Sequence, residues 1–262
     1  MPEPADPLRT WIGWSTPDSI TLAGRDLPAD IMGRLSLTEL AYLLLTRREP
    51  GDGERRLLDA VLVSLADHGL TPSALAARLT FTGAPEAIQG AVAAGLLGAG
   101  SVFLGPAGDT AQFLAGALSA HAAGRTDDDT LADVARLAVD ERVRAGLRVP
   151  GLGHPVHRVE DPRTARLFEL AVAEGLYGPH ARLLRLAASA HEAASGRRLP
   201  INGAGAAGAV LVDIGIAPAN VRGVVLIART AGLVAHLAEE ADQPIGMPLW
   251  LEVERRSRPP TA

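Results

Sequence analysis

The pattern of apolar and polar positions along the chain is mainly helical. In residues 54–68 (ERRLLDAVLVSLADH), apolar side chains recur every three or four positions, which is typical of an amphipathic helix. Ser36 followed by Glu39 forms a capping box and predicts a helix that begins there and is closed by Pro50. A short strand and turn are predicted only within 19–27. The pattern therefore predicts an all-α fold of about ten to twelve helices, judged by the usual helix length.

Glycine and alanine dominate two of the predicted helices. Segment 85–100 (PEAIQGAVAAGLLGAG) opens with a proline, and segment 201–215 (INGAGAAGAVLVDIG) grows into an apolar helix. Small side chains let helices approach closely, so we expect segment 85–100 to be buried against another helix or a second subunit. A break is predicted over 100–109, in front of a helix that runs to about His121.

The last part of the chain is predicted to hold one long helix and a loose end. Apolar positions continue through 219–240, and this predicted helix carries Arg229 and His236. The final residues, ERRSRPPTA from Glu254 onward, are expected to be frayed.

A loop interrupts the helices at 149–166 (VPGLGHPVHRVEDPRTAR), where prolines and glycines prevent regular structure. It carries four side chains that can hold an anion: His154, His157, Arg158 and Arg163. Arginine presents a rigid fork that matches carboxylates and phosphates, and histidine donates a hydrogen bond near neutral pH. The loop is therefore a candidate anion site, and a solvated surface loop with scattered basic residues is the alternative.

Composition excludes several classes of function. The net charge of −5 and the lack of a sustained basic run argue against nucleic-acid and anionic-membrane partners. The absence of cysteine rules out disulfides, thiolate zinc sites and thiol nucleophiles, and fits a reducing cytoplasm. Aromatic residues make up only 3% of the chain, which favours packed helices over a β-sandwich. We expect neither a signal peptide nor a membrane span.

The central loop resembles the signature of the citrate synthase family. The pattern GxGHxVxxxxDPR is matched without a gap by Gly153, His154, Val156, Asp161, Pro162 and Arg163. Segment 65–78 (LADHGLTPSALAAR) resembles a second family motif, which implies that His68 binds an oxaloacetate carboxylate. Segment 228–239 (ARTAGLVAHLAE) resembles a third, which implies that Arg229 is a second carboxylate-binding arginine.

Each of these residues also has a plain structural interpretation. His68 could simply oppose the dipole at a helix C-terminus, and Arg229 could be a surface arginine. The neighbours of Arg229 are apolar, however, and a buried guanidinium needs an anionic partner, either a ligand or an acidic side chain. His236 is interpreted as a structural or interface residue.

The sequence departs from the family pattern at two positions. The family places a catalytic aspartate, which removes a proton from the methyl group of acetyl-CoA, where this chain has Ala204. A histidine that polarises the thioester carbonyl in ordinary citrate synthases is replaced by Gly108. Asp109 is either a group facing the site or a helix cap, and Asp213 is not assumed to replace the missing base.

The chain is shorter than typical citrate synthases and resembles the compact citryl-CoA lyase type, which is similar to the C-terminal lyase domain of ATP-citrate lyase. The resemblance implies an all-α homodimer whose site lies between a small subdomain, roughly 125–215, and a large one. It implies chemistry between acetyl-CoA, oxaloacetate and citryl-CoA without a metal.

The resemblance also assigns roles to residues. His68, Arg163 and Arg229 would bind the carboxylates of an oxo acid, and His154 would stabilise charge on its carbonyl or hydroxyl oxygen. His68 and His154 are the candidate catalytic residues. The coenzyme A thioester would contact Gly151, Gly153 and Arg158. Two alternatives remain: a relative that binds a CoA ester and a dicarboxylate for another reaction, and a non-catalytic partner of a true synthase.

Overall fold

The computed structural model describes residues 9–154 and 157–258. Pro155 and Val156 of the central loop, and with Val156 one position of the family signature, lie outside the described residues. The elements, in chain order, are β1 Gly13–Ser15, β2 Ile20–Leu22, β3 Arg25–Asp26, the π-helical turn η1 Leu27–Ile31, α1 Leu37–Thr46, α2 Asp52–Ala66, α3 Pro72–Gly83, α4 Ile88–His121, α5 Asp128–Arg144, α6 Pro162–Ala173, α7 Pro179–Ser195, α8 Gly203–Asp213, the 3₁₀ turn η2 Pro218–Asn220, α9 Val221–Asp242 and α10 Gly246–Arg256.

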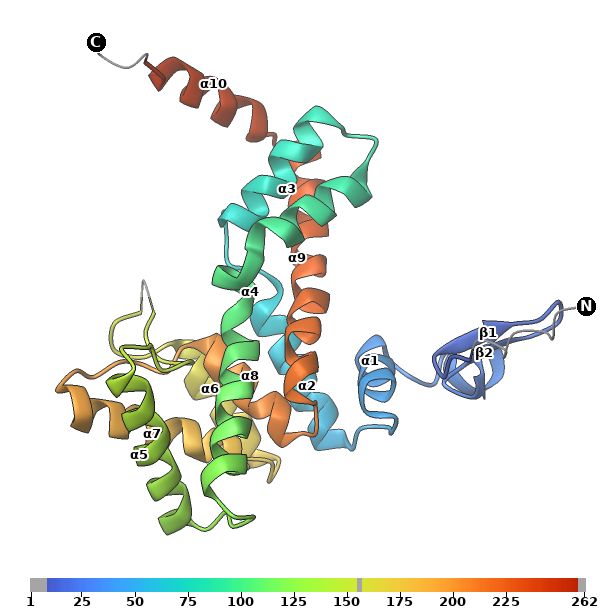
Figure 1. Cartoon of the computed structure of the whole chain (residues 1–262). Coiled ribbons are helices and arrows are strands. Elements are labelled where there is room, and N and C mark those ends of the chain that lie inside the picture. The colour runs from blue at the N-terminus through green and yellow to red at the C-terminus, as the bar shows by residue number, and fades with distance from the viewer. Residues whose placement is uncertain (1–8, 155–156, 259–262) are drawn as a thin grey trace, which may run out of the picture.

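Two long helices, α4 and α9, pack against each other through the body of the molecule (Figure 1). The helices α2 and α3 pack on this pair, and α5 to α8 gather beside the second half of α4. Strands β1 to β3 form a small antiparallel meander that projects from the body, as does α10 at the other end of the chain. The all-α class predicted from periodicity is confirmed. The group α5–α8 falls within the predicted small subdomain, whose boundary stays a prediction.

Glycines allow the closest helix contacts, as the small-residue segments predict. A Cβ added to Gly208 of α8 would lie 2.3 Å from the carbonyl oxygen of Ala107 in α4. A Cβ added to Gly232 of α9 would lie 2.0 Å from the carbonyl oxygen of Ala66 in α2. These distances are far below van der Waals contact, so α8 and α9 sit where they do only because these positions lack side chains.

Helix starts follow the predicted capping chemistry. Ser36 accepts from the backbone N–H of Glu39, and Glu39 accepts from that of Ser36, so the predicted capping box is present. Thr71 caps α3, which begins with Pro72. Each cap satisfies a backbone donor that the first helical turn leaves without a partner. The predicted strand and turn within 19–27 are also confirmed, as β2 and β3.

The predicted break over 100–109 is confirmed at Gly100, where α4 is kinked, and is wrong for the residues beyond it. The chain departs from helical geometry only at Gly100 (φ 50°, ψ −156°), and α4 continues through Pro106 to His121. Asp109 therefore lies inside a helix and caps nothing. The second half of α4 is clamped against α8 at Ala107, and this packing outweighs the backbone hydrogen bond that Pro106 cannot donate. The preceding helix begins at Ile88 rather than at Pro85.

Two other boundaries differ from expectation. The central loop ends at Asp161, since Pro162 opens α6 and the Asp161 side chain caps it. The end of the chain is not frayed from Glu254 onward, because α10 runs to Arg256. Packing of α10 on α3 orders a segment whose polar composition suggested an unstructured tail.

Two segments, 88–121 and 218–242, are long and apolar enough to cross a membrane by length and composition alone. Within the protein, however, the second holds two buried charged residues, Arg229 and Glu240. The first half of α4 leaves large apolar side chains uncovered, among them Leu97, which is 82% exposed. These helices thus combine a packed face with an apolar face that nothing in the described chain covers.

The contact between α9 and the end of α2 makes a stability prediction. Gly232→Ala should lower the free energy of unfolding by about 1–3 kcal/mol, because the new methyl group overlaps a backbone carbonyl that cannot rotate away. Gly223→Ala in the same helix meets nothing within 4 Å and should be neutral or stabilising by up to about 1 kcal/mol. Chemical denaturation of both variants measures the difference, and equal stabilities would contradict the proposed close contact.

Candidate active site

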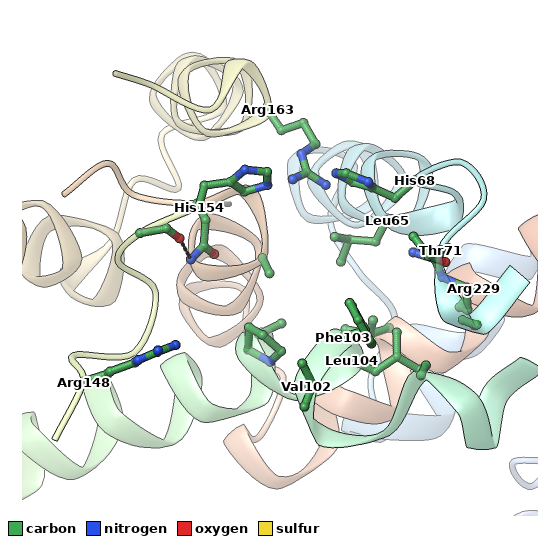
Figure 2. Close-up of a pocket in the computed structure, with 18 residues that line it drawn as sticks. Leu65, His68, Thr71, Val102, Phe103, Leu104, Arg148, His154, Arg163 and Arg229 are labelled. Atoms are coloured by element: carbon green, nitrogen blue, oxygen red, sulfur yellow. Dashed lines mark hydrogen bonds between the residues drawn. The ribbon is translucent and has the colours of Figure 1, made fainter. Parts of the chain in front are cut away.

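A cavity of about 560 Å³ opens between α4, α8, α9 and the loops that follow α2 and precede α6 (Figure 2). One wall is apolar and comes from α4, with Val102, Phe103 and Leu104. The opposite side carries imidazole and guanidinium groups. The lining residues are Leu65, His68, Thr71, Ser73, Ala99, Val102, Phe103, Leu104, Pro106, Ala107, Arg148, Gly153, His154, Arg163, Asn202, Ala204, Val225 and Arg229.

Backbone contacts hold the histidine loop against the start of α8. Gly153 N–H donates to the Pro200 carbonyl at 2.7 Å, and Asn202 donates from its side-chain Nδ2 to the Gly153 carbonyl at 2.9 Å. Gly151 takes φ +85°, and an added Cβ there would lie 3.0 Å from Leu184 and Thr110. The glycine is therefore required both for its left-handed backbone and for space.

His154 is oriented as a neutral donor. Its Nδ1 accepts a hydrogen bond from the backbone N–H of His157 at 3.0 Å, so the proton of the neutral ring lies on Nε2. Burial lowers the pKa of His154, and the nearby His157 lowers it further, which keeps the ring neutral near pH 7. A neutral imidazole that presents an N–H suits the stabilisation of negative charge on a carbonyl oxygen.

Asp161 fixes the direction of Arg163. Its fully buried carboxylate accepts from Nε of Arg163 at 3.0 Å and from Nη2 at 2.8 Å. The same carboxylate accepts from the backbone N–H of Gly203 at 2.7 Å, which ties α6 to the first turn of α8. Burial opposes ionisation of Asp161, but these donors outweigh it and lower its pKa to about 2. An added Cβ at Gly203 would lie 2.6 Å from Nε of Arg163, so this position must be glycine.

Arg229 brings a buried guanidinium with unused donors. It is 9% exposed, and its Nε and Nη1 have no hydrogen-bond partner among the described residues. The carboxylate of Asp67 lies 3.7 Å from Nη1, beyond hydrogen-bond distance. Burial lowers the pKa of Arg229, and Asp67 only partly opposes this effect. Donors left without acceptors in a buried site are costly, and an anionic ligand in the cavity would supply the acceptors.

His68 stands in the turn after α2 and completes the polar side of the cavity. Its ring centroid lies 6.0 Å from that of His154. Arg163 extends from α6 toward the space between the two imidazoles, and Arg229 lies on the far side of His68 (Figure 2). The four side chains come from α2–α3, the central loop, α6 and α9, and they face one cavity.

The structure brings most of the predicted site residues together, but not all. Gly153 lines the cavity together with the four cationic or imidazole side chains. Gly151 does not line it and packs against Leu184 and Thr110 instead. Arg158 is exposed and does not line the cavity. Their predicted contact with coenzyme A stays a prediction.

Neither of the two departures from the family pattern is compensated within the described chain. Ala204 lines the cavity, and no aspartate or glutamate is among the described lining residues. Asp213 lies at the end of α8 and accepts hydrogen bonds from the backbone of His180 and Ala181, so it caps α7. Gly108 is buried in α4 beside Arg222, outside the cavity lining.

Two lining residues were missed by sequence reasoning. Arg148 precedes the central loop and lines both this cavity and a second one of about 560 Å³, which also contains Gly153 and His154. The second cavity adds Arg197 and His191. Asn202 caps the start of α8 and lines the main cavity. A basic residue next to a glycine-rich loop was the available signal for Arg148.

His154, His157 and Asp161 place ligand atoms within 4.8 Å of one another, a spacing that a metal ion could use. Their atoms are already engaged, however. Both Asp161 oxygens accept hydrogen bonds from Arg163, and Nδ1 of His154 accepts from His157. The donor set does not fit a resident metal, in line with the expected metal-free chemistry.

Comparison with known proteins matches most of the chain. Residues 22–249 match the family described as citrate synthase, C-terminal domain. Two relatives, from Mycobacterium bovis and Mycobacterium tuberculosis, carry a name that marks their assignment as citrate synthase 2 as provisional, and each is 31% identical over 221 residues. This alignment covers 82% of the chain and 55% of each relative, so the chain spans about half of their length.

Solved structures show the same fold. Citryl-CoA lyase from Hydrogenobacter thermophilus is 30% identical with a TM-score of 0.85, and the match covers 97% of this chain and 95% of that one. ATP citrate lyase from Methanothrix soehngenii (20% identical, TM-score 0.76) matches over 99% of this chain and 43% of its own. Citrate synthase from Thermoplasma acidophilum (19% identical, TM-score 0.61) matches over 86% and 56%. The last two share the fold alone.

The helical architecture, the loop that carries His154 and the agreement over residues 22–249 lead to one assignment. The chain belongs to the citrate synthase family.

Proposed function

We propose that the protein is a citryl-CoA lyase or citrate synthase-like enzyme that cleaves or forms the carbon–carbon bond between acetyl-CoA and oxaloacetate. The observation that carries the proposal is the convergence of Arg163, Arg229, His68 and His154 on one cavity, with no carboxylate among the described residues that line it. Such a cavity attracts a small dianion. The similarity in sequence and fold to citryl-CoA lyase from Hydrogenobacter thermophilus favours the lyase type.

The two guanidinium groups and His68 would hold the substrate carboxylates. Arg229 offers its unused donors, and Arg163 is held by Asp161 so that its guanidinium edge points in a set direction. Bidentate contacts of this kind set the orientation of a carboxylate as well as its affinity. His154 then donates from Nε2 to the oxygen that is a hydroxyl in citryl-CoA and a carbonyl in oxaloacetate.

In cleavage, the hydroxyl proton passes to solvent water, because Nε2 of His154 already carries a proton. The carbonyl forms, and the electron pair of the breaking bond passes to the CH₂ carbon as a thioester enolate. That enolate takes a proton to become acetyl-CoA. In condensation the same steps run in reverse. His154 stabilises charge on the oxygen, but Ala204 supplies no group that exchanges the proton on carbon. Loss of one such acid–base group costs about 10²–10⁴ in rate, so we expect a slow enzyme.

The second cavity suits the coenzyme A portion of the substrate. It shares Arg148, Gly153 and His154 with the first and extends toward Arg197 and His191. Coenzyme A carries several phosphate charges, and arginines that line a groove match them. The structures of ATP citrate lyase from Methanothrix soehngenii and citrate synthase from Thermoplasma acidophilum contain coenzyme A and carboxymethyl coenzyme A, respectively.

A second candidate follows from Ala204. With no carboxylate among the described lining residues, the cavity could bind oxaloacetate or a CoA ester for another reaction, or belong to a non-catalytic partner of a true synthase. These alternatives keep the same binding groups and differ only in the chemistry, so binding and turnover must be measured separately.

We also propose a homodimer. Leu97 of α4 is 82% exposed and Val234 of α9 is 48% exposed, on helices whose other faces are packed. A second copy would cover these faces, because apolar surface left in water on two adjacent helices costs about 25 cal/mol per Å².

The absence of cysteine supports a reducing compartment such as the cytoplasm.

The lyase proposal predicts measurable turnover that Ala204→Asp increases. The wild-type protein should cleave citryl-CoA slowly, and Ala204→Asp should accelerate it by about 10²–10⁴ because it restores a carboxylate in the first turn of α8. Release of acetyl-CoA and oxaloacetate measures both rates. Activity in Ala204→Asp alone, with none in the wild type, would show that the natural protein is not a lyase.

Arg229→Met separates binding from stability. Oxaloacetate affinity, measured by calorimetry, should fall by about 10- to 100-fold, since a hydrogen bond to a charged group contributes about 1.5–3 kcal/mol. The melting temperature should hold or rise, because the variant removes a buried charge, two of whose nitrogen atoms find no partner among the described residues. A large loss of stability with unchanged affinity would assign Arg229 a structural role. No heat from the wild type with either oxaloacetate or coenzyme A would leave only the partner role.

The proposed dimer is tested by Leu97→Glu. Light scattering should give twice the mass of one chain for the wild type and a lower apparent mass for the variant, because a charge would be buried in the contact. Gly223→Ala, at an exposed position of α9, serves as a folded reference. A wild-type protein that remains a monomer at high concentration would refute the dimer.

A further inference from the structure

A hydrogen-bonded network of charged groups extends from the end of α9 to the turn that carries His68, outside the lining of the cavity. Arg78 of α3 is 2% exposed and donates from Nη1 to Glu240 at 3.0 Å. It also donates to Nδ1 of His236, from Nε at 3.1 Å and from Nη2 at 3.0 Å, and it pairs with Glu239. His236 in turn contacts Asp67, with 2.8 Å between Nε2 and Oδ1. None of these residues lines the cavity.

The hydrogen bonds in this network determine which atoms donate and which accept. Because Arg78 has only donors, Nδ1 of His236 must accept, and its proton therefore sits on Nε2. Nε2–H then donates to Asp67. Glu240 accepts from Arg78 and from the backbone N–H groups of Ile245 and Gly246, which anchors the far end. Rotation of the His236 ring would break its hydrogen bonds to both Arg78 and Asp67.

Asp67 is the member of this network that lies next to the candidate site. Its Oδ2 accepts from the backbone N–H of Gly69 at 2.7 Å, which closes the turn that carries His68. Its Oδ1 lies 3.7 Å from Nη1 of Arg229. Burial raises the pKa of Asp67, but the donors Gly69 and His236 lower it more, so the carboxylate stays charged. The Cβ of Asp67 is 3.4 Å from a Cβ added to Gly232, so α9 presses directly on this turn.

We propose that Asp67, held by His236 and Arg78, is a positioning residue that aims His68 and Arg229 into the cavity. The inference rests on the proposed binding of oxaloacetate for its functional meaning, but the geometry is independent of it. His68 follows Asp67 in the chain, and Arg229 precedes His236 by seven residues on the same helix. The hydrogen bond from His236 to Asp67 therefore links His68 and Arg229, two predicted carboxylate-binding residues that lie far apart in the sequence.

Positioning and simple electrostatics predict opposite effects of the same substitution. Asp67 adds a negative charge beside the cavity, so if it acted only through its field, Asp67→Asn would strengthen the binding of a dianion. If Asp67 positions His68 and Arg229, the same change should weaken binding, because small displacements of binding groups cost about tenfold to a hundredfold. The sign of the change distinguishes the two.

The test uses the full-length protein with four variants. Oxaloacetate affinity is measured by calorimetry for Asp67→Asn, His236→Phe, His236→Gln and Asp127→Asn. Glutamine keeps an N–H that can reach Asp67, whereas phenylalanine fills the space without a donor. Asp127 caps α5 far from the cavity and controls for the loss of a capping charge.

We expect affinity to fall about tenfold or more in Asp67→Asn and His236→Phe. His236→Gln and Asp127→Asn should stay close to the wild type. Equal or tighter binding in Asp67→Asn, or equal loss in both His236 variants, would overturn the positioning role.

A second readout does not depend on oxaloacetate. In protein labelled at histidine ¹³Cε1, the His68 resonance is assigned by its loss in His68→Gln. It should shift or broaden in Asp67→Asn and His236→Phe and stay in place in His236→Gln and Asp127→Asn. An unchanged His68 signal in Asp67→Asn and His236→Phe would refute the inference even if the wild type binds no oxaloacetate, an outcome that would itself count only against the proposed function.

Discussion

The buried carboxylate of Asp161 is the contact on which the cavity depends. It caps α6, orients Arg163 with two of its hydrogen bonds and holds the first turn of α8 through Gly203. Because a carboxylate with no exposure must have its acceptors satisfied, the two segments that supply its donors, the start of α6 and the first turn of α8, are constrained together. The start of α8 in turn holds the His154 loop through Asn202. A single buried anion thus organises the cationic side of a cavity whose described lining contains no carboxylate.

The buried guanidinium of Arg229 lowers the stability of the folded protein, and an anionic ligand that accepts its hydrogen bonds would restore that stability. Arg229 is buried, and two of its nitrogen atoms have no hydrogen-bond partner in the part of the chain that the structure describes. The Asp67 carboxylate, 3.7 Å from Nη1, attracts the guanidinium but lies beyond hydrogen-bond distance. Strain of this kind persists where the surrounding structure holds it, and it concentrates at functional sites. The hydrogen-bonded network from Glu240 to Asp67 holds the surrounding structure from outside the cavity.

The predictable part of the fold and site was the part encoded by local rules. Helical periodicity, the Ser36–Glu39 capping box and the family-like spacing around His154 were all visible in one dimension, and each was found in the structure. The break predicted over 100–109 is present at Gly100 but failed beyond it, because Pro106 is a local signal, whereas the contact between Ala107 and Gly208 that keeps α4 helical joins residues far apart. The helix α10 escaped notice because its order depends on α3 and on Glu240.

By itself, the sequence determined the helical class, the family signature, the identity of the cationic and imidazole groups and the lack of an acid at Ala204. These follow from residue type and spacing, which need no coordinates. Only the tertiary structure decided that His68, Arg163 and Arg229 face one cavity, that Asp213 is used as a helix cap, that Arg158 points elsewhere and that Arg148 joins two cavities. The physical reason is that hydrogen bonds and close packing between distant segments set side-chain direction, and neither contact is written in local sequence.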